Sequence, residues 1–296
     1  MIVLLNDHEV YNVRYRSSLI SALVSNNYKY TSIGILDGFF SILRALYYIF
    51  ITDHCFFSSN MKSNLFFLIF FTKSGVVLFN GLGRYRKSKF FRLCLVFFIK
   101  INFNKTFIFQ NYADYRYFKT KADGNLSWIP GSGGTCRNIG DDKFLIVTRI
   151  DKIDSISDSI YNFISSFCLS EVYVVGCSEE ALAEKGFDGC LFKACGYLPQ
   201  DDLFIHGSNF IQPQGYGEGI PHTLVDAICS GMDIWMKPSE FINFGFYKLG
   251  FRRSHNNDSG WSKLIYDENS KVNVSSEVVV NMYLNCLLNS CARNSS

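Results

Sequence analysis

The sequence predicts an α/β fold made of two consecutive domains, each a mainly parallel sheet covered by helices. Three observations support this. Short apolar segments of strand length alternate with helical segments from residue 2 to residue 129. A glycine-rich break, Pro130-Gly131-Ser132-Gly133-Gly134, comes next, and a second alternating series starts at Phe144. Such alternation favours parallel sheets, because a crossover between parallel strands usually needs a helix. We expect domains at 1–135 and 136–296, with a cleft between them.

The first domain opens with the strand candidate Ile2–Leu5, and a helical pattern follows through Leu19, Ile20 and Leu23. Further strand candidates are Thr31–Leu36, Val76–Phe79, Thr106–Gln110 and Ser127–Ile129. Three apolar runs are too short to cross a membrane: Phe39–Ile51, Leu65–Phe71 and Leu93–Ile99. We expect these runs to be buried helices and strands. Contact with a bilayer surface is the alternative that stays open.

The second domain repeats the pattern. Its strand candidates are Phe144–Thr148, Glu171–Gly176, Cys190–Ala194 and Phe210–Gln212. Its helix candidates are Ser157–Phe167, Thr223–Cys229, which Gly231 ends, and Glu277–Leu288. We expect the last of these helices to cross back to the first domain.

The composition excludes several classes of protein. A net charge of +3 on 296 residues is too small to imply nucleic-acid binding, and no nucleic-acid motif is visible. The ten cysteines are scattered and form no C-x-x-C pair, so a structural zinc site is not expected. Several cysteines lie in apolar runs, where a reduced thiol behaves as a small hydrophobic group. We therefore expect free thiols and a cytoplasmic location.

The segment from Gly217 to Ala227 carries the clearest chemical pattern. Gly219 lets backbone approach a ligand closely. Pro221 suits the start of a helix, whose free N–H groups attract phosphate. Asp226, about one turn further on, can accept hydrogen bonds from ribose hydroxyls, and Glu218 in the preceding loop can face a sugar. The alternative is that both acids are ordinary surface residues.

This segment resembles the E-G-x-P-x-x-L-x-E-A signature of retaining glycosyltransferases of family four. The matching residues are Glu218, Gly219, Pro221, Leu224 and Ala227, and Asp226 stands where the family usually has a second Glu. Val147-Thr148-Arg149-Ile150 resembles the family's G-R-L turn, whose Arg neutralises the donor diphosphate. The Lys expected nearby falls on Asp154, with Lys152 two residues earlier.

The first domain resembles the same family in members that build O-antigen and capsule polysaccharides. Lys62-Ser63-Asn64 resembles a K-P-N segment, and Asn80-Gly81-Leu82-Gly83 resembles an N-G-L-G turn. Phe109-Gln110-Asn111 with Asp114, followed by Ile129–Gly133, resembles "F-Q-N-x-x-D … I-P-G-S-G". The opening Leu4-Leu5-Asn6-Asp7 and Arg16 also fit, and the resemblance covers roughly residues 1–231.

The resemblance implies a GT-B architecture, in which two Rossmann-like domains face each other across a cleft. It implies retaining transfer of a sugar from a UDP- or GDP-sugar to a saccharide or polyprenyl-diphosphate-linked acceptor, without a metal ion or cofactor. Glu218 is then the catalytic candidate. The donor-binding candidates are Arg149, Lys152, Gly219, Ile220, Pro221 and Asp226. The acceptor-side candidates are Asn6, Lys62, Asn80 and Gly81.

Two other functions stay open. The departure at Asp154 also suits a catalytically silent GT-B subunit that binds a partner enzyme. Another GT-B enzyme, such as a sugar-nucleotide epimerase, is the second alternative.

The run from Arg84 to Arg92 mixes five cations with aromatic residues. Such charge is attracted to anionic lipids. We expect contact with the cytoplasmic face of the inner membrane through Arg84, Arg86, Lys87 and Lys89. The alternative is a solvated helix face.

Overall fold

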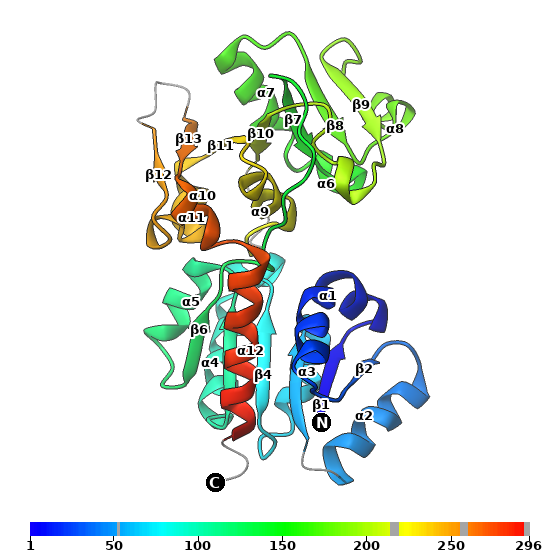
Figure 1. Ribbon diagram of the computed structural model, residues 1–296, viewed down its shortest axis with the longest axis vertical. Coiled ribbons are helices and arrows are strands. Elements are labelled where there is room, and N and C mark those ends of the chain that lie inside the picture. The colour runs from blue at the N-terminus through cyan, green and yellow to red at the C-terminus, as the bar shows by residue number, and fades with distance from the viewer. Residues whose placement is uncertain (52–53, 214–218, 255–259, 293–296) are drawn as a thin grey trace. The chain divides into compact units, whose positions relative to one another are not determined.

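The computed structural model describes residues 1–51, 54–213, 219–254 and 260–292, and the chain forms two compact units (Figure 1). Unit 1 comprises Met1–Ser132, Tyr216–Ile220 and Ser276–Ser296, and unit 2 comprises Gly133–Gly215 and Pro221–Ser275. The division between Ser132 and Gly133 lies within the glycine-rich segment. The division differs from 1–135 and 136–296, because the chain returns to unit 1 at its final helix.

Unit 1 contains a six-stranded, fully parallel sheet in the order β2-β1-β3-β4-β5-β6. Its strands are β1 (Ile2–Asn6), β2 (Tyr30–Gly34), β3 (Cys55–Ser59), β4 (Gly75–Phe79), β5 (Lys105–Phe109) and β6 (Asn125–Trp128). Every residue of β1, β3, β4 and β5 is buried. Strands that are buried on both faces are typical of parallel sheets covered by helices on both sides.

Two layers of helices cover the sheet of unit 1. The layer on one face consists of α2 (Phe39–Ile51), α3 (Met61–Leu68), α4 (Lys89–Ile101) and α5 (Tyr112–Lys119). The other face carries α1 (Glu9–Ser25) and α12 (Ser276–Ala292), the red helix in Figure 1. Alternate residues of each strand serve the two cores; Val3 packs in the first and Leu4 in the second. The helix expected near the C-terminus, and its return to the first unit, are confirmed.

The expectation that the long apolar runs are buried is wrong for α2 and α4. Among thirteen residues of α2, Ala45 and Ile49 are the buried ones, and in α4 they are Leu95 and Ile99. The other apolar side chains of these two helices are partly or largely exposed. Within the described ranges, no helix has the length and hydropathy that crossing a membrane requires.

Two further features of unit 1 differ from the sequence-based expectation. The strand β3 was not predicted, because its two final residues are serines and its apolar run is only three residues long. Cys55 at the start of β3 forms a disulfide with Cys291 in α12, with their Cα atoms 5.3 Å apart. The prediction of free thiols throughout the chain is therefore corrected at these two positions, which lie 236 residues apart in sequence.

Unit 2 contains a seven-stranded sheet in the order β12-β13-β11-β10-β7-β8-β9. The parallel strands are β7 (Phe144–Val147), β8 (Val172–Val175), β9 (Phe192–Gly196), β10 (Asn209–Gln212) and β11 (Asp233–Met236). The strands β12 (Arg252–Arg253) and β13 (Ser262–Ile265) add an antiparallel edge that the sequence did not predict. The helices are α6 (Ile150–Ile153), α7 (Ser157–Phe167), α8 (Glu179–Glu184), α9 (His222–Cys229), α10 (Pro238–Phe244) and α11 (Glu268–Val272). Two mainly parallel sheets with helices confirm the α/β class.

Candidate functional site

Polar side chains gather at the carboxyl edge of the unit 1 sheet. Asn6 and Ser59 end β1 and β3, and Asn60 and Asn80 directly follow β3 and β4. The carboxyl ends of parallel strands lie at one edge of a sheet, and ligands of open α/β sheets bind outside that edge. This edge is therefore the expected position of a ligand-binding site in unit 1.

A chain of hydrogen bonds, here called the asparagine network, runs along this edge. Arg16 Nη2 donates to Asn80 Oδ1 at 2.7 Å, and Asn80 Nδ2 donates to Asn60 Oδ1 at 2.7 Å. Asn60 Nδ2 donates to Asn6 Oδ1 at 2.6 Å, and Asn6 Nδ2 donates to Asn12 Oδ1 at 2.9 Å. A guanidinium can only donate, so Asn80 must turn its oxygen toward Arg16. That constraint fixes the orientation of each amide that follows.

Arg16 is an unusual anchor for this network. It is only 5% exposed, and burial lowers the pKa of its guanidinium. Its hydrogen-bond acceptors are neutral oxygens, namely Asn80 Oδ1 and Tyr15 O, with Ser132 Oγ at 3.5 Å. No ion pair of Arg16 with a carboxylate occurs among the described residues. A buried charge held by neutral groups is costly, which is typical of functional positions.

Asn60 has a strained backbone at the centre of the network. Its φ of 73° and ψ of 160° lie in a region that residues other than glycine rarely adopt. Such strain costs about 1–3 kcal/mol and collects at ligand-binding positions. Its two side-chain hydrogen bonds, to Asn80 and Asn6, stabilise this conformation.

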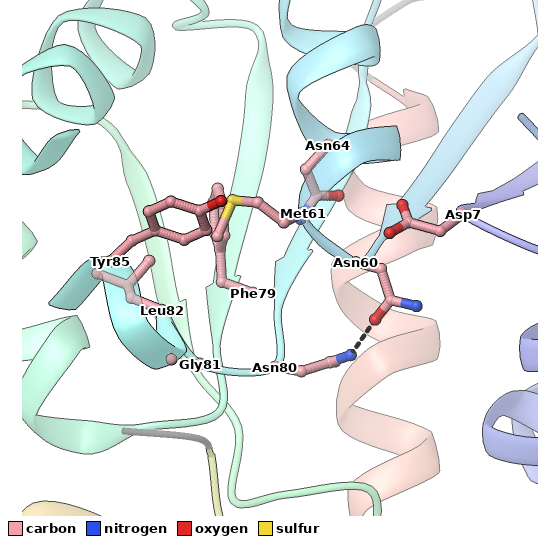
Figure 2. A pocket seen from close by; sticks show the side chains of 10 residues that line it. Asp7, Asn60, Met61, Asn64, Phe79, Asn80, Gly81, Leu82 and Tyr85 are labelled. Carbon is pink, nitrogen blue, oxygen red and sulfur yellow. Dashed lines mark hydrogen bonds between the residues drawn. The ribbon is translucent and has the colours of Figure 1, made fainter. Parts of the chain in front are cut away.

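A pocket of about 430 Å³ opens beside the network (Figure 2). One part of its lining is polar, with Asp7, Asn60, Asn64 and Asn80, and another is apolar, with Met61, Phe79, Leu82 and Tyr85. Gly81 and Gly83 complete the lining. The volume lies within the range of small-molecule sites. A sugar ring, which has hydroxyl edges and C–H faces, matches a lining with both characters.

Two carboxylates hold the walls of this pocket. Asp7 Oδ1 accepts a hydrogen bond from Ser63 N at 2.8 Å, which fixes Asp7 against the amino end of α3. Asp114, in α5, accepts from the backbone N–H of Leu82 and forms an ion pair with Arg86 at 3.3 Å. Burial raises the pKa of Asp114 to about 6, against the opposing effect of Arg86. Asp114 thus anchors the turn that carries Gly81 and Leu82.

The structure brings three of the four acceptor-side candidates together. Asn6 and Asn80 belong to the network, and Gly81 lines the pocket. Lys62 is exposed on α3 and is not among the pocket-lining residues. Asn60 is a further residue of this group, and the sequence did not indicate it because the strand β3 that precedes it was not predicted.

In unit 2, the expected phosphate-binding residues follow β7. Arg149 precedes α6, its side chain is 65% exposed, and Nε lies 3.4 Å from Asp151 Oδ1. Lys152 is half-buried in the same short helix. Asp154, at the position of the expected Lys, pairs with Lys185 at 2.5 Å. Arg149 and Lys152 therefore both lie at the carboxyl end of β7, the edge outside which ligands of open α/β sheets bind.

The signature segment leads into α9. Glu218 lies outside the described residues. Gly219 N donates to Asn80 O, and a Cβ added at Gly219 would lie only 2.5 Å from that oxygen, so no side chain fits there. Ile220 is buried, and Pro221 precedes the first residue of α9. The residues of α9 from Leu224 to Cys229 are all buried, which leaves its amino end as the accessible part.

A contact with ribose requires an accessible carboxylate at Asp226, and the structure instead places this carboxylate in the interior of unit 2. Its side chain is fully buried. Oδ1 accepts from Thr135 N at 2.8 Å, and Oδ2 lies 3.3 Å from Arg137 Nε and 3.7 Å from His222 Nε2. The carboxylate therefore ties the first segment of unit 2 to α9. A ribose hydroxyl would have to share an acceptor that protein donors already use.

No group of three or more His, Cys, Asp or Glu side chains suited to a metal ion occurs within the described ranges. The side-chain hydrogen-bonding groups among the residues that line the pocket are three amides, a carboxylate and the hydroxyl of Tyr85. These groups suit recognition of hydroxyls.

No protein-family model matches the sequence. No curated protein matches it either. Among solved structures, the chain is similar to Anabaena Alr3699/HepE in complex with UDP and glucose, with a TM-score of 0.56 and 10% identity over 99% of this chain and 93% of that chain. The complex of the same protein with UDP gives a TM-score of 0.54 at the same identity and coverage. This likeness over both units, at so low an identity, concerns the fold, and the GT-B class is confirmed.

Proposed function

We propose that this protein transfers a sugar from a nucleotide-sugar donor to a saccharide acceptor that binds in the pocket of unit 1. The observation that carries the proposal is the pocket itself. It has polar and apolar walls at the carboxyl edge of a parallel sheet, and the asparagine network fixes the direction of its amides. A rigid set of directed donors and acceptors suits recognition of hydroxyls.

The donor, in this proposal, is bound by Arg149, Lys152 and the amino end of α9. Cations and free backbone N–H groups both stabilise a diphosphate. Glu218 orients the transferred sugar through its hydroxyls, and Gly219 and Ile220 shape the approach to Pro221. That the structure of Alr3699/HepE holds UDP and glucose supports a nucleotide-sugar donor here. We propose that Asp226 contacts the ribose. The competing assignment is a structural role, in which the buried carboxylate only holds Thr135 and Arg137.

The proposed reaction retains the configuration of the sugar. Departure of the diphosphate gives the transition state oxocarbenium character, so Arg149 and Lys152 would act by stabilising charge on the leaving group. The acceptor we propose is linked to a polyprenyl diphosphate and belongs to O-antigen or capsule synthesis at the cytoplasmic face of the inner membrane. Arg84, Arg86, Lys87 and Lys89 would contact anionic lipid there. Of these, Lys87 and Lys89 are exposed, whereas Arg86 pairs with Asp114.

A catalytically silent partner subunit is the second candidate. It is favoured by Asp154, which replaces the expected Lys and is neutralised by Lys185. An epimerase acting on a sugar nucleotide is a third candidate. Incubation with UDP- and GDP-sugars separates the three functions. Transfer or slow hydrolysis of the donor indicates a transferase, interconversion of two donor sugars indicates an epimerase, and neither change indicates a silent subunit.

Single substitutions test the donor site. Arg149→Ala should weaken UDP or GDP binding by about tenfold or more, because a hydrogen bond to a charged group contributes roughly 1.5–3 kcal/mol. Glu218→Ala should lower transfer by about 10²-fold while leaving binding of the free nucleotide nearly unchanged, since that product lacks the sugar. Calorimetric titration and a transfer assay measure both effects. Arg252→Ala, which removes an exposed cation of β12, is the control. If Arg149→Ala binds nucleotide as the wild type does, the proposed donor site is wrong.

A further inference from the structure

The outer faces of α2 and α4 are apolar where a surface helix is normally polar. Phe40 is 83% exposed and Phe90 is 79% exposed. The exposed apolar residues of α2 are Phe39, Phe40, Leu43, Tyr47, Phe50 and Ile51, and those of α4 are Phe90, Leu93 and Phe97. Scattered exposed hydrophobic residues are normal in proteins, but large groups of them mark interaction sites.

The spacing shows that each helix is apolar on two opposite sides. In α4, Phe90, Leu93 and Phe97 recur at intervals of three and four, which places them on one stripe. Leu95 and Ile99 form the opposite stripe, which packs into the core of unit 1. The core explains only the second stripe. The first stripe needs another apolar environment.

The two outer faces belong to one surface, here called the docking face. Both helices pack on the same side of the sheet. The ring of Phe50 in α2 lies 5.6 Å from that of Phe70, which follows α3. Asn102, at the end of α4, donates to Leu68 O of α3 at 3.1 Å. The turn after α3 adds exposed Ile69 and Phe71.

The charge of this region identifies the kind of partner. Residues 39–113 contain ten of the 29 Lys and Arg residues of the chain and one of its 26 Asp and Glu residues; of the ten, Lys105 is buried and Arg86 pairs with Asp114, which leaves eight. Lys89 and Lys100 lie at the two ends of α4 and are exposed. Phenylalanines bordered by lysines match the boundary between anionic headgroups and acyl chains. An acidic protein surface would match the lysines but would leave the phenylalanines in water.

We propose that the outer faces of α2 and α4 dock on an anionic lipid bilayer and insert their phenylalanines among the headgroups. This proposal deepens the proposed function, on which its choice of a lipid-linked acceptor rests, although the docking itself does not require sugar transfer. The pocket lies next to the amino end of α4, because Tyr85, which lines it, stacks on Phe91 of α4 with ring centroids 4.9 Å apart. An acceptor sugar held at the headgroups of that bilayer would lie near the pocket.

Co-sedimentation with vesicles tests the docking face. The wild type should bind vesicles that contain both phosphatidylcholine and phosphatidylglycerol. It should bind vesicles of phosphatidylcholine alone much more weakly. Joint replacement of Phe40, Phe90 and Phe97 by Ser should weaken binding at least tenfold, which corresponds to about 1.4 kcal/mol. Replacement of Lys87, Lys89 and Lys100 by Ser should weaken binding most at low salt, because screening reduces electrostatic attraction. The matched control replaces Val10, Val13 and Val24 by Ser; these residues are exposed on α1, on the other side of the sheet.

A second measurement separates insertion from simple adsorption. The F97W variant adds one tryptophan, whose fluorescence is the difference between the emission spectra of variant and wild type. With anionic vesicles this difference spectrum should shift to the blue, and brominated lipid should quench it. UDP titration of the triple phenylalanine variant should match the wild type, so a failed donor assay and a failed docking assay are distinguishable. The proposal is overturned if that folded variant binds vesicles as tightly as the wild type. It is also overturned if the wild type does not bind vesicles but forms a dimer that the triple phenylalanine variant cannot form.

Discussion

At the scale of single residues, Asn60 allows backbone strain to be measured separately from hydrogen bonding. Asn60→Gly and Asn60→Ala both remove its side-chain hydrogen bonds to Asn80 and Asn6. Only alanine also has to adopt the positive φ with a Cβ. We expect the alanine variant to be less stable by about 1 kcal/mol, because a left-handed conformation disfavours L-residues by roughly that amount.

Urea unfolding of the two variants measures this difference. Asn285, exposed in the middle of α12, is the control position. There alanine should be the more stable substitution by about 1 kcal/mol, since glycine disfavours a helix. The same order of stability at both positions would show that Asn60 carries no strain.

Asp114 predicts a specific dependence of stability on pH. Its pKa of about 6 in the folded protein lies above the ordinary value of 3.8, so the folded state holds its proton more tightly than the unfolded state does. Folding stability should therefore fall as pH rises from about 4 to 6, and stay level above that range. A shift of this size corresponds to on the order of 2–3 kcal/mol, since one pKa unit equals about 1.4 kcal/mol.

Asp114→Asn cannot ionise and should lose this dependence. The difference in free energy of unfolding, variant minus wild type, should rise across the same pH range. Urea unfolding at several pH values from 4 to 7 measures the difference. A constant difference would mean that Arg86 keeps the pKa of Asp114 near its ordinary value.

Where a motif marked candidate residues in the sequence, the structure places several of them close together. Asn80 and Gly81 belong to a recognisable turn and line the pocket, and Asn6 joins Asn80 in the asparagine network through Asn60. The burial of Asp226 was not predictable, because its partners Thr135 and Arg137 come from a segment about ninety residues earlier. Local spacing places a residue on a helix, whereas long-range contacts decide whether solvent reaches it.

At the scale of elements, α12 completes the core of unit 1. Leu287 is fully buried in the cluster formed with Val279 and Tyr283 and with strand residues such as Phe57. Leu287→Ala should destabilise unit 1 by about 2–5 kcal/mol, the usual cost of such a cavity. Hydrogen exchange should become faster at the amides of β3 and β4 and stay unchanged at those of β7 and β10. Asn285→Ala, on the exposed side of α12, should change neither set, and uniform acceleration in both units would contradict the prediction.

Periodicity predicted the elements that are regular over several turns. The bounds of α7 agree with the helix expected from the sequence, and α2 coincides with the apolar run at Phe39–Ile51, which the sequence did not assign to a helix rather than a strand. Short strands were missed, namely β3, which ends in two serines, β11, which is four residues long, and the antiparallel pair β12 and β13. The outward aromatic residues of α2 misled the prediction of burial, because hydrophobicity indicates an apolar environment without saying whether protein or lipid provides it.

At the scale of the whole molecule, the α/β class followed from the alternation of short apolar and longer amphipathic segments. The break near Gly133 was also visible in the sequence. The assignment of residues 276–296 to unit 1 depends on which sheet face lacks a cover, and that face is a property of the assembled unit. Sequence alone could suggest the return of the chain but could not show that α12 supplies part of the core.

The position of α12 in the chain has a consequence for synthesis on the ribosome. The strands of unit 1 are made first, and α1 follows β1 at once, but the part of the same sheet face that packs against α12 stays open until that helix is made. All of unit 2 is translated in between, which at about 5–20 residues per second takes on the order of ten seconds. During that interval Phe57 in β3 and Leu78 in β4 lack the cover that α12 provides, so the nascent chain presents an apolar surface that a chaperone would bind. Unit 2 can therefore complete its fold before unit 1, although the sequence encodes it second.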